Sequence, residues 1–409
     1  MTPSFQAPKG TFDILPAEEE ARSRVLHAGA ELFGRAGYAR IETPAFEDTE
    51  LFARGVGEAT DIVRKEMFTF DDAGGRSITL RPEGTAGICR AYVEHGMHKL
   101  PQPVKLWYWG PFFRYEAPQA GRFRQFTQVG LEALGSAEPS LDADAILLLA
   151  DLLERSGARE VRLRLSSLGT PETRRDYSGE LREYLRAHED ELSDEVRARI
   201  DANPLRAFDS DHPGTKRVME DAPRLIDRLA PDDAEHLDRV RALLDAAGQP
   251  YELDGTLVRG LDYYTRTVFE FESGALGAQS ALGGGGRYDL LVEQLGGPPT
   301  PGVGWAAGIE RILLASEEAA PQPAPAVYVA GEANTVAFAL ARDLRARGIA
   351  TELEQAGRSL KGQLKHADRL GASQVVIVNG DGFQVKDMAT GDQRAAASAD
   401  EVIEMVERG

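Results

Sequence analysis

Hydrophobic and polar residues follow a helical period near the start of the chain and a strand period soon after it. From Ala17 to about Arg35, five apolar residues recur at helical intervals: Val25, Leu26, Ala30, Leu32 and Phe33. Acidic residues crowd the first turn and Gly37 follows the last, so we expect a helix there. The next segment, YARIETPAFED, predicts a strand in which Pro44 must lie at an edge or a break, because proline cannot donate a ladder hydrogen bond.

Strand-like runs dominate between Ile78 and Gly135. Three segments carry the pattern: SITLRPEG, VKLWYWGPFFRYE and FRQFTQVGLEALG. Their even spacing and aromatic content predict neighbouring strands of an antiparallel sheet. The middle of the chain, from about Thr170 to Ala247, returns to helical spacing of Arg, Asp, Glu, Ala and Leu, which indicates a helical insertion.

Strand patterns resume at Tyr251 and run through the glycine-rich segment ALGGGGRYD, from Ala281 to Asp289. We expect a helix to begin near Gly304 and to carry Ile309, Ile312 and Leu313.

The segment AAPQPAPA, at 319–326, predicts an extended linker between two domains. Beyond it the pattern is strand, helix, strand, helix, strand, strand and helix, which is typical of a small α/β domain with a largely parallel sheet. We therefore expect a core made of residues 1–169 and 248–320, a helical insertion at 170–247, and a C-terminal α/β domain at 325–409. The fold class is α/β (α+β), with an antiparallel sheet flanked by helices.

Length, composition and charge limit the classes of protein to which the chain can belong. A chain of 409 residues with 42% hydrophobic and 28% charged residues indicates a globular protein of two or three domains. No apolar run approaches the roughly 20 residues that span a bilayer, and no signal-peptide pattern is visible, so we expect no membrane partner. Cys89 is the only cysteine, which excludes an intramolecular disulfide and a cysteine-based zinc cluster and favours the cytoplasm. A net charge of −19 argues against indiscriminate nucleic-acid binding but allows a local basic patch.

One segment, RGLDYYTRTVFEF, combines groups that suit a small ligand. The guanidinium of Arg259 matches a carboxylate or a phosphate, because planar paired donors meet planar paired acceptors. Tyr263 and Tyr264 offer flat faces with hydroxyl ends for a heteroaromatic group. Taken alone, the segment could also be an amphipathic edge strand with surface charges.

Two further strands present polar side chains on one face, because side chains alternate with period two. The first face carries Phe112, Arg114 and Glu116, and the second carries Arg124, Phe126, Gln128, Gly130 and Glu132. We expect Gly130 to leave floor space for a ligand. Arg122, in the loop between these strands, could close over phosphates. The alternatives are a solvated sheet face with ion pairs and a basic hairpin tip.

Several common site signatures are absent from the sequence. GGGG at 283–286 lacks the ending of a P-loop, and GVGWAAGIER only approaches a dinucleotide fingerprint. No HExxH, paired CxxC or GxSxG motif occurs, so we expect no protein-built metal site.

In the C-terminal domain four cations fall within about 80° on a helix: Arg358, Lys361, Lys365 and Arg369. This stripe could track a phosphate backbone or could be the solvated face of an amphipathic helix, with Leu360, Leu364 and Ala367 toward the core.

These elements, in this order, resemble those of the histidyl-tRNA synthetases, a family of class II aminoacyl-tRNA synthetases, over essentially the whole chain. ETPAFED resembles motif 1, FFRYE with Arg122 and RQF resembles motif 2, and GVGWAAGIERI resembles motif 3. RGLDYYTRTVFEF and ALGGGGRYD resemble the two motifs specific to histidine enzymes. The class I signatures HIGH and KMSKS are absent.

The resemblance implies a role for each matching position. Arg259 would be the catalytic arginine, and Arg114 would contact the α-phosphate of ATP and the activated carboxyl. The implied histidine-binding residues are Glu83, Thr85, Gln128, Glu132, Tyr263 and Tyr264. The implied ATP-binding residues are Arg114, Glu116, Arg122, Phe126 and Arg311, with Phe126 and Arg311 on either side of adenine. One departure is Thr127, where the family often has histidine; alternation directs Thr127 away from the ligand face.

The resemblance also implies partners. ATP with Mg²⁺, L-histidine and the cognate tRNA would be the substrates, motif 1 would build a homodimer, and the C-terminal domain would bind the anticodon arm. One alternative is a plain nucleotide-binding module without transfer activity. Another is the synthetase-like regulatory subunit of ATP phosphoribosyltransferase. Such regulatory subunits keep the fold of the catalytic domain but usually lose the anticodon domain and the arginine motif.

Overall fold

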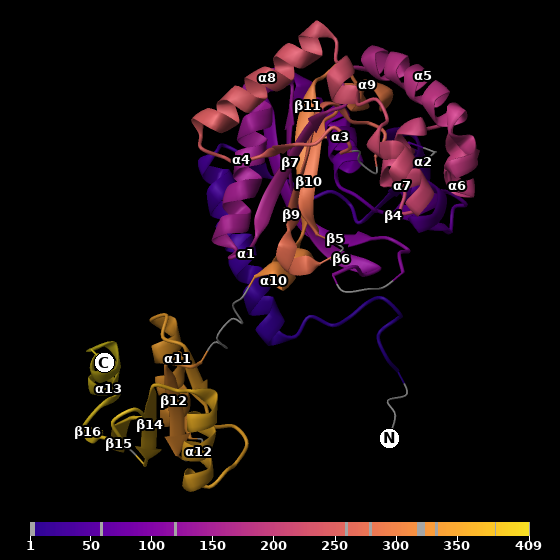
Figure 1. Cartoon of the computed structure of the whole chain (residues 1–409). Coiled ribbons are helices and arrows are strands. Elements are labelled where there is room, and N and C mark those ends of the chain that lie inside the picture. The colour runs from indigo at the N-terminus through magenta and orange to yellow at the C-terminus, as the bar shows by residue number, and fades with distance from the viewer. Residues whose placement is uncertain are drawn as a thin grey trace. The chain divides into compact units, whose positions relative to one another are not determined.

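In the computed structural model, the described residues divide into two units, 1–320 and 321–409 (Figure 1). The structure describes residues 5–57, 60–117, 121–257, 261–277, 280–316, 324–331, 334–380 and 382–408. No helix within those ranges is both long enough and apolar enough to cross a bilayer.

A large sheet, antiparallel apart from its two edge pairs, forms the centre of the first unit. Its strands lie in the order β1-β5-β6-β11-β10-β9-β7-β8. Their bounds are β1 Ala39–Arg40, β5 Val104–Phe113, β6 Gln125–Leu134, β7 Val161–Ser167, β8 Glu252–Leu253, β9 Thr265–Ser273, β10 Ala281–Arg287 and β11 Gly302–Gly308. The parallel pairs are β1 with β5 and β7 with β8. The expected antiparallel sheet flanked by helices is confirmed.

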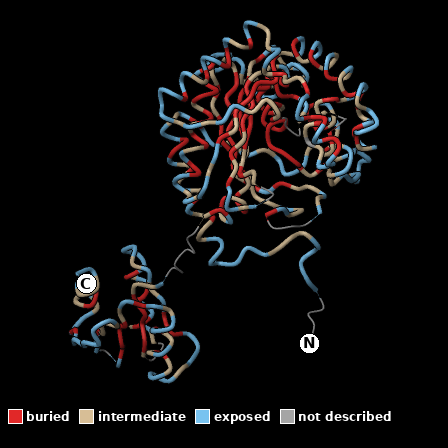
Figure 2. Tube along the Cα trace, in the orientation of Figure 1, coloured by how far each residue is buried: buried red, intermediate tan, exposed pale blue. Residues whose placement is uncertain are grey.

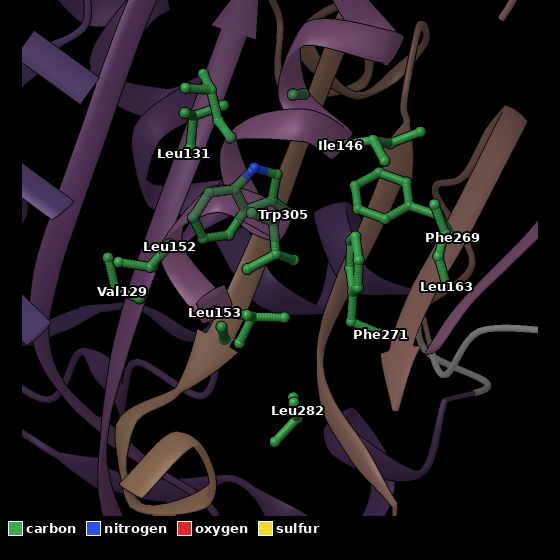
Figure 3. Close-up of a cluster of buried hydrophobic side chains, with 14 of the residues drawn as sticks. Val129, Leu131, Ile146, Leu152, Leu153, Leu163, Phe269, Phe271, Leu282 and Trp305 are labelled. Atoms are coloured by element: carbon green, nitrogen blue, oxygen red, sulfur yellow. The ribbon is translucent and has the colours of Figure 1, made fainter. Parts of the chain in front are cut away.

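One face of this sheet carries the main core. The helices α1 (Pro16–Arg35), α4 (Pro139–Arg155) and α8 (Pro231–Ala246) cover it (Figure 1). Trp305 of β11 is buried among aliphatic side chains of β6 and α4, with Phe269 and Phe271 of β9 beside them (Figure 3). The strands through this core are the most continuously buried part of the unit (Figure 2). The side chains on the opposite face of the same strands are not part of this core and are available to form a binding site.

Pro44 divides the predicted strand YARIETPAFED. The segment forms β1 at its start and β2 (Phe46–Asp48) after the proline. β2 belongs to a small antiparallel sheet with β4 (Ser77–Leu80) and β3 (Phe68–Asp71), in the order β2-β4-β3. α2 (Thr49–Val56), α3 (Thr85–Glu94) and α9 (Leu291–Gln294) pack nearby.

Helices fill the segment between β7 and β8. They are α5 (Pro171–Ala187), α6 (Asp194–Arg199), α7 (Pro213–Glu220) and α8, with short 3₁₀ turns between them. The guanidinium of Arg174 donates to the carbonyl oxygen of Tyr264 at 2.7 Å. Arg266 forms an ion pair with Asp233 at 3.0 Å. These contacts tie the helical segment to the start of β9.

The helix expected from Gly304 begins five residues later, so that expectation was wrong. Residues 302–308 form β11, and α10 spans Ile309–Ala315. β11 lies between β6 and β10, and an added Cβ at Gly285 of β10 would stand only 2.6 Å from Cα of Trp305. The glycines therefore allow closely spaced central strands.

The second unit contains the sheet β13-β12-β14-β15-β16. Its elements are β12 Val327–Gly331, α11 Thr335–Ala346, β13 Thr351–Leu353, α12 Leu360–Leu370, β14 Gln374–Asn379, β15 Gly382–Asp387, β16 Gln393–Ala396 and α13 Ala399–Arg408. The pairs among β13, β12 and β14 are parallel, whereas β14–β15 and β15–β16 are antiparallel. The sheet is mixed rather than largely parallel, because β14, β15 and β16 follow one another through tight turns.

The basic stripe of α12 is shorter than expected. Arg358 precedes the helix and forms an ion pair with the buried Glu354 at 3.3 Å. Leu360 is 41% exposed, so its expected place toward the core was wrong. The buried Gln363 lies there instead and donates to the carbonyl oxygen of Gly331 at 3.1 Å. Lys361, Lys365 and Arg369 are exposed.

Candidate functional site

A cavity lies on the face of the large sheet opposite the main core. Strand β6 buries Val129, Leu131 and Ala133 in that core, so its alternate residues face the other way. Glu132 pairs with Leu106 and Gly304, Gly130 with Tyr108 and Ala306, and Gln128 with Gly110 and Gly308.

The cavity has a volume of about 470 Å³. The predicted site residues among those that line it are Glu83, Thr85, Arg114, Glu116, Arg122, Phe126, Gln128, Tyr263, Tyr264 and Arg311. These residues come from sequence segments far apart, and the fold brings them to one place. Arg259 lies outside the described residues, and the four C-terminal cations belong to the other unit.

In one part of the cavity lining, Glu83 closes the first turn of α3. Its carboxylate accepts the backbone N–H of Thr85 at 2.7 Å and that of Ala86 at 2.9 Å. A carboxylate suits this position because the first N–H groups of a helix have no partner within it. Burial raises the pKa of Glu83, against the lowering effect of these N–H groups and of Arg114.

Glu132 lies beneath this part of the cavity lining and is fully buried. Its Oε1 accepts the Thr85 hydroxyl at 2.7 Å, and its Oε2 accepts the hydroxyl of Tyr288. Burial raises the pKa of Glu132 to about 8. Gly304 leaves room for this carboxylate, because an added Cβ there would stand 1.8 Å from Oε2.

Tyr108 fills the space that the sequence analysis gave to a ligand. An added Cβ at Gly130 would lie 2.1 Å from Cζ of Tyr108, and one at Gly84 would lie 2.6 Å from the same atom. The expectation that Gly130 leaves floor space for a ligand was therefore wrong. The glycine instead admits a phenol, whose oxygen has no hydrogen-bond partner within the described residues.

Another part of the cavity lining is rich in arginine. Arg114 donates from Nε to the carbonyl oxygen of Pro82 at 2.9 Å, and its guanidinium carbon lies 5.4 Å from the centre of the Phe126 ring. Glu116 forms ion pairs with Arg114 at 3.7 Å and with Arg122 at 3.3 Å. An anion that replaced Glu116 as the partner of these guanidinium groups would find paired donors already in place.

Arg311 of α10 completes this part of the lining. It donates from Nε to the carbonyl oxygen of Ala281. Burial and the nearby charge of Arg122 lower its pKa. An added Cβ at Gly121 would lie 3.3 Å from Cγ of Arg311, so Gly121, the neighbour of Arg122, packs against this side chain.

Matches to known protein families decide what kind of protein carries this cavity. The family model described as histidyl-tRNA synthetase matches residues 10–312, and the model described as anticodon binding domain matches residues 324–408. The chain belongs to the histidyl-tRNA synthetase family.

Relatives in this family span nearly the whole chain. A histidine–tRNA ligase of Rubrobacter xylanophilus is 48% identical over 408 residues, which cover 96% of each chain. One of Desulforamulus reducens is 48% identical over 399 residues, covering 95% of each. The crystal structure of apo S. aureus histidyl-tRNA synthetase superposes with a TM-score of 0.81 at 34% identity, covering 98% of this chain and 100% of that one. The resemblance drawn from the motifs is confirmed.

Thr127, where the family often has histidine, faces away from the cavity as alternation predicts. Its hydroxyl accepts from Arg22 of α1 at 2.8 Å, and its backbone N–H donates to Glu310 at 3.0 Å. Arg22 and Glu310 form a buried ion pair at 2.7 Å.

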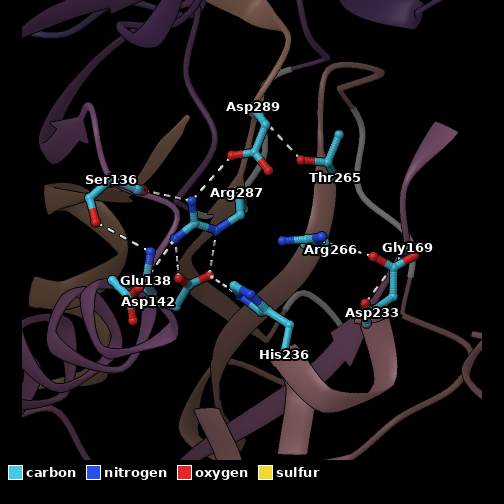
Figure 4. A network of polar contacts seen from close by, with 11 residues as sticks. Ser136, Glu138, Asp142, Gly169, Asp233, His236, Thr265, Arg266, Arg287 and Asp289 are labelled. Atoms are coloured by element: carbon cyan, nitrogen blue, oxygen red, sulfur yellow. Dashed lines mark hydrogen bonds and ion pairs between the residues drawn. The ribbon is translucent and has the colours of Figure 1, made fainter. Parts of the chain in front are cut away.

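Sequence reasoning missed Tyr108, Tyr288 and Glu270, although Tyr108 and Glu270 line the cavity and Tyr288 holds Glu132. Tyr288 was visible within ALGGGGRYD, but its partner lies 156 positions away. Its neighbour Arg287 is fully buried and binds Asp142 of α4, which His236 of α8 also contacts at 3.4 Å (Figure 4). This network anchors the turn on which Tyr288 stands.

Proposed function

We propose that this chain activates L-histidine with ATP to histidyl-adenylate and transfers the histidyl group to the 3′ end of its cognate tRNA. Membership of the family makes the chain an aminoacyl-tRNA synthetase. The observation that carries the proposal is one cavity whose lining combines two chemically different groups of residues. One group offers carboxylates, an amide and phenols, and the other offers arginines with an aromatic ring.

The first group suits an amino acid with an imidazole side chain. An α-ammonium group donates hydrogen bonds only, and Gln128 offers a buried Oε1 without a partner in the described residues. Glu83 and Thr85 complete the amine site. Glu132 and Tyr264 would bind the two nitrogen atoms of imidazole, and Tyr263, whose ring centre lies 4.8 Å from that of Tyr264, would line the pocket.

The second group suits a nucleoside triphosphate. Arg114 would contact the α-phosphate, Arg122 the γ-phosphate, and Phe126 and Arg311 would enclose adenine, with Glu116 beside them. The histidine carboxylate would attack the α-phosphate in line, so that catalysis depends on positioning and charge neutralisation. Arg259 would be the catalytic arginine, placed on the reacting carboxylate and α-phosphate.

The residues of the cavity fit Mg²⁺, which prefers carboxylate and phosphate oxygens. Glu116 and Glu270 line the cavity and would hold the ion together with the phosphates of ATP. When bound, the ion would neutralise charge on the departing pyrophosphate. Among the residues that the structure describes, no group of three or more side chains is arranged to hold a metal, so phosphate and water would supply the remaining ligands.

Beyond the cavity, the proposal includes the tRNA, a second copy of the chain and the cytoplasm as the place of action. Lys361, Lys365 and Arg369 would contact the anticodon arm, and Arg358 would stabilise the loop ahead of α12 through Glu354. The domains would be a catalytic core at 1–169 and 248–320, an insertion at 170–247 and an anticodon-binding domain at 325–409. Motif 1, with Pro44, would lie at the homodimer interface.

The comparisons favour a ligase over the regulatory subunit, because the C-terminal unit matches an anticodon binding domain and histidine–tRNA ligases match over full length. Charging of a histidine tRNA by the purified protein tests the proposal. We expect histidine and ATP to be consumed together with acylation of the tRNA. Histidine binding without charging would favour the regulatory subunit.

A further inference from the structure

Two buried oxygen atoms of side chains that line the cavity have no hydrogen-bond partner within the described residues. They are Oε1 of Gln128 and the phenol oxygen of Tyr108. Gln128 has a role in the proposed function, whereas Tyr108 has none. Since buried polar groups are nearly always paired, each unpaired atom beside a cavity indicates a partner that arrives with a ligand.

The position of Tyr108 is fixed by two glycines. Its ring covers Gly130 of β6 and touches the backbone at Gly84, where added Cβ atoms would lie 2.2 Å and 2.8 Å from the phenol oxygen. Tyr108 is only 6% exposed. The oxygen is therefore held at one point of the cavity lining and cannot turn to solvent for a partner.

That point lies between the two ends of the amino-acid pocket. Gly130 stands between Gln128 and Glu132 on one face of β6, and Tyr108 is the cross-strand partner of Gly130. Burial raises the pKa of Tyr108, with smaller contributions from Glu132 and Glu83 and an opposing one from Arg81, so the phenol stays neutral. A neutral, buried hydroxyl without a partner in the described residues offers its oxygen as an acceptor to a donor group of a ligand.

We propose that the Tyr108 hydroxyl accepts a hydrogen bond from the α-ammonium group of the bound amino acid, beside Gln128. An ammonium group carries three donors and no acceptor, so it suits a site made of acceptor oxygens. Tyr108 is thus a further substrate-binding residue that selects for an amino acid over its deaminated analogue. This inference rests on the proposed function.

Tyr108→Phe removes only the hydroxyl, and Gly84 and Gly130 still hold the ring. Tyr38→Phe is the matched control, because the Tyr38 hydroxyl is also buried without a partner in the described residues but belongs to the main core. We expect Tyr108→Phe to raise the KM for histidine in ATP–pyrophosphate exchange about tenfold, equivalent to about 1.4 kcal/mol. The KM for ATP should stay unchanged, and Tyr38→Phe should change neither.

Two inhibitors identify the contacted group. Histidinol keeps the amine and imidazole, whereas 3-(imidazol-4-yl)propionate lacks the amine. We expect Tyr108→Phe to weaken inhibition by histidinol about tenfold and to leave inhibition by imidazolylpropionate unchanged. An unchanged KM for histidine, or equal weakening of both inhibitors, would overturn the inference. Wild-type protein without histidine-dependent exchange would instead overturn the proposed function.

Discussion

The hydroxyl of Thr85 donates a 2.7 Å hydrogen bond to Glu132, which lies 47 positions further along the chain. The backbone N–H of the same threonine donates to Glu83 at 2.7 Å. One residue at the start of α3 therefore joins both carboxylates of the proposed histidine pocket. Because each carboxylate has a fixed partner, the amine and imidazole ends of the pocket stand at a fixed separation before any ligand binds.

The carboxyl group of Glu132 should make stability depend on pH. Its pKa is about 8 in the folded protein and 4.5 without burial, so the folded protein retains a proton that the unfolded chain releases. The free energy of unfolding should be highest below pH 4.5 and should fall as the pH rises from 4.5 to about 8, the window between the two pKa values. The expected slope is roughly 1.4 kcal/mol for each pH unit. Glu132→Gln should flatten this dependence. Urea unfolding of both proteins across the window checks it, and parallel slopes would contradict it.

Gly304→Ala should disturb the same carboxylate. The new Cβ would stand 1.8 Å from Oε2 of Glu132 and 2.5 Å from the carbonyl oxygen of Leu131. We expect a loss of about 1–3 kcal/mol in the free energy of unfolding and at least a tenfold rise in the KM for histidine. Gly34→Ala is the control, since an added Cβ at Gly34 meets nothing within 4 Å. Equal behaviour of the two variants would show that Glu132 tolerates displacement.

Arg259→Ala should separate binding from catalysis. If Arg259 is the catalytic arginine, its removal should slow pyrophosphate exchange at least about a hundredfold, on the scale of a lost electrostatic donor at a transition state. Histidine binding and the melting temperature should stay close to those of the wild type. Isothermal titration with histidine and an exchange assay measure the two effects, and near-normal exchange would remove Arg259 from this role.

Arg287→Met should destabilise the fold. Arg287 and Asp142 are both fully buried, so the substitution leaves Asp142 in the interior without its guanidinium partner. We expect a loss of about 3–5 kcal/mol, and a smaller loss when Asp142 is replaced by leucine in the same protein. Arg228→Ala, which breaks an exposed ion pair with Glu180, serves as the control. A thermal melt in which Arg287→Met matches that control would contradict the prediction.

Lys361, Lys365 and Arg369 should act on tRNA alone. Replacing all three with alanine should raise the KM for tRNA and reduce the salt dependence of charging, because fewer counterions are released on binding. Histidine-dependent exchange should not change, since that step needs no tRNA. A control variant replaces Arg342 and Arg345 of α11 and Arg347 directly after it, which are also exposed. Equal loss in both variants would point to net charge rather than to α12.

The sequence allowed the polar face of β6 to be predicted, because period-two alternation is local. It placed Phe126, Gln128 and Glu132 on one face and Thr127 on the other. Tyr108 could not be assigned to Gly130 in the same way, because that contact depends on the register between β5 and β6. The contact between Tyr288 and Glu132 could not be predicted for a similar reason, since it joins residues that are 156 positions apart.

Two errors have local causes. The small residues of GVGWAAG carry no clear hydrophobic period. The helical spacing of Ile309, Ile312 and Leu313 therefore predicts a helix that begins too early, within the central strand β11. In the C-terminal unit, four cations at helical spacing suggested one stripe. Arg358 instead pairs with Glu354, a buried carboxylate whose pKa lies at about 2 because its hydrogen bonds from Tyr328, Arg358 and nearby backbone N–H groups outweigh burial.

Histidine-dependent ATP–pyrophosphate exchange by the purified wild-type protein tests the central claim most directly. The assay requires both groups of cavity residues to act together, and no tRNA is needed. We expect exchange with L-histidine and none above background with histidinol, which lacks the reacting carboxylate. Well-folded protein that shows no exchange with L-histidine would contradict the account.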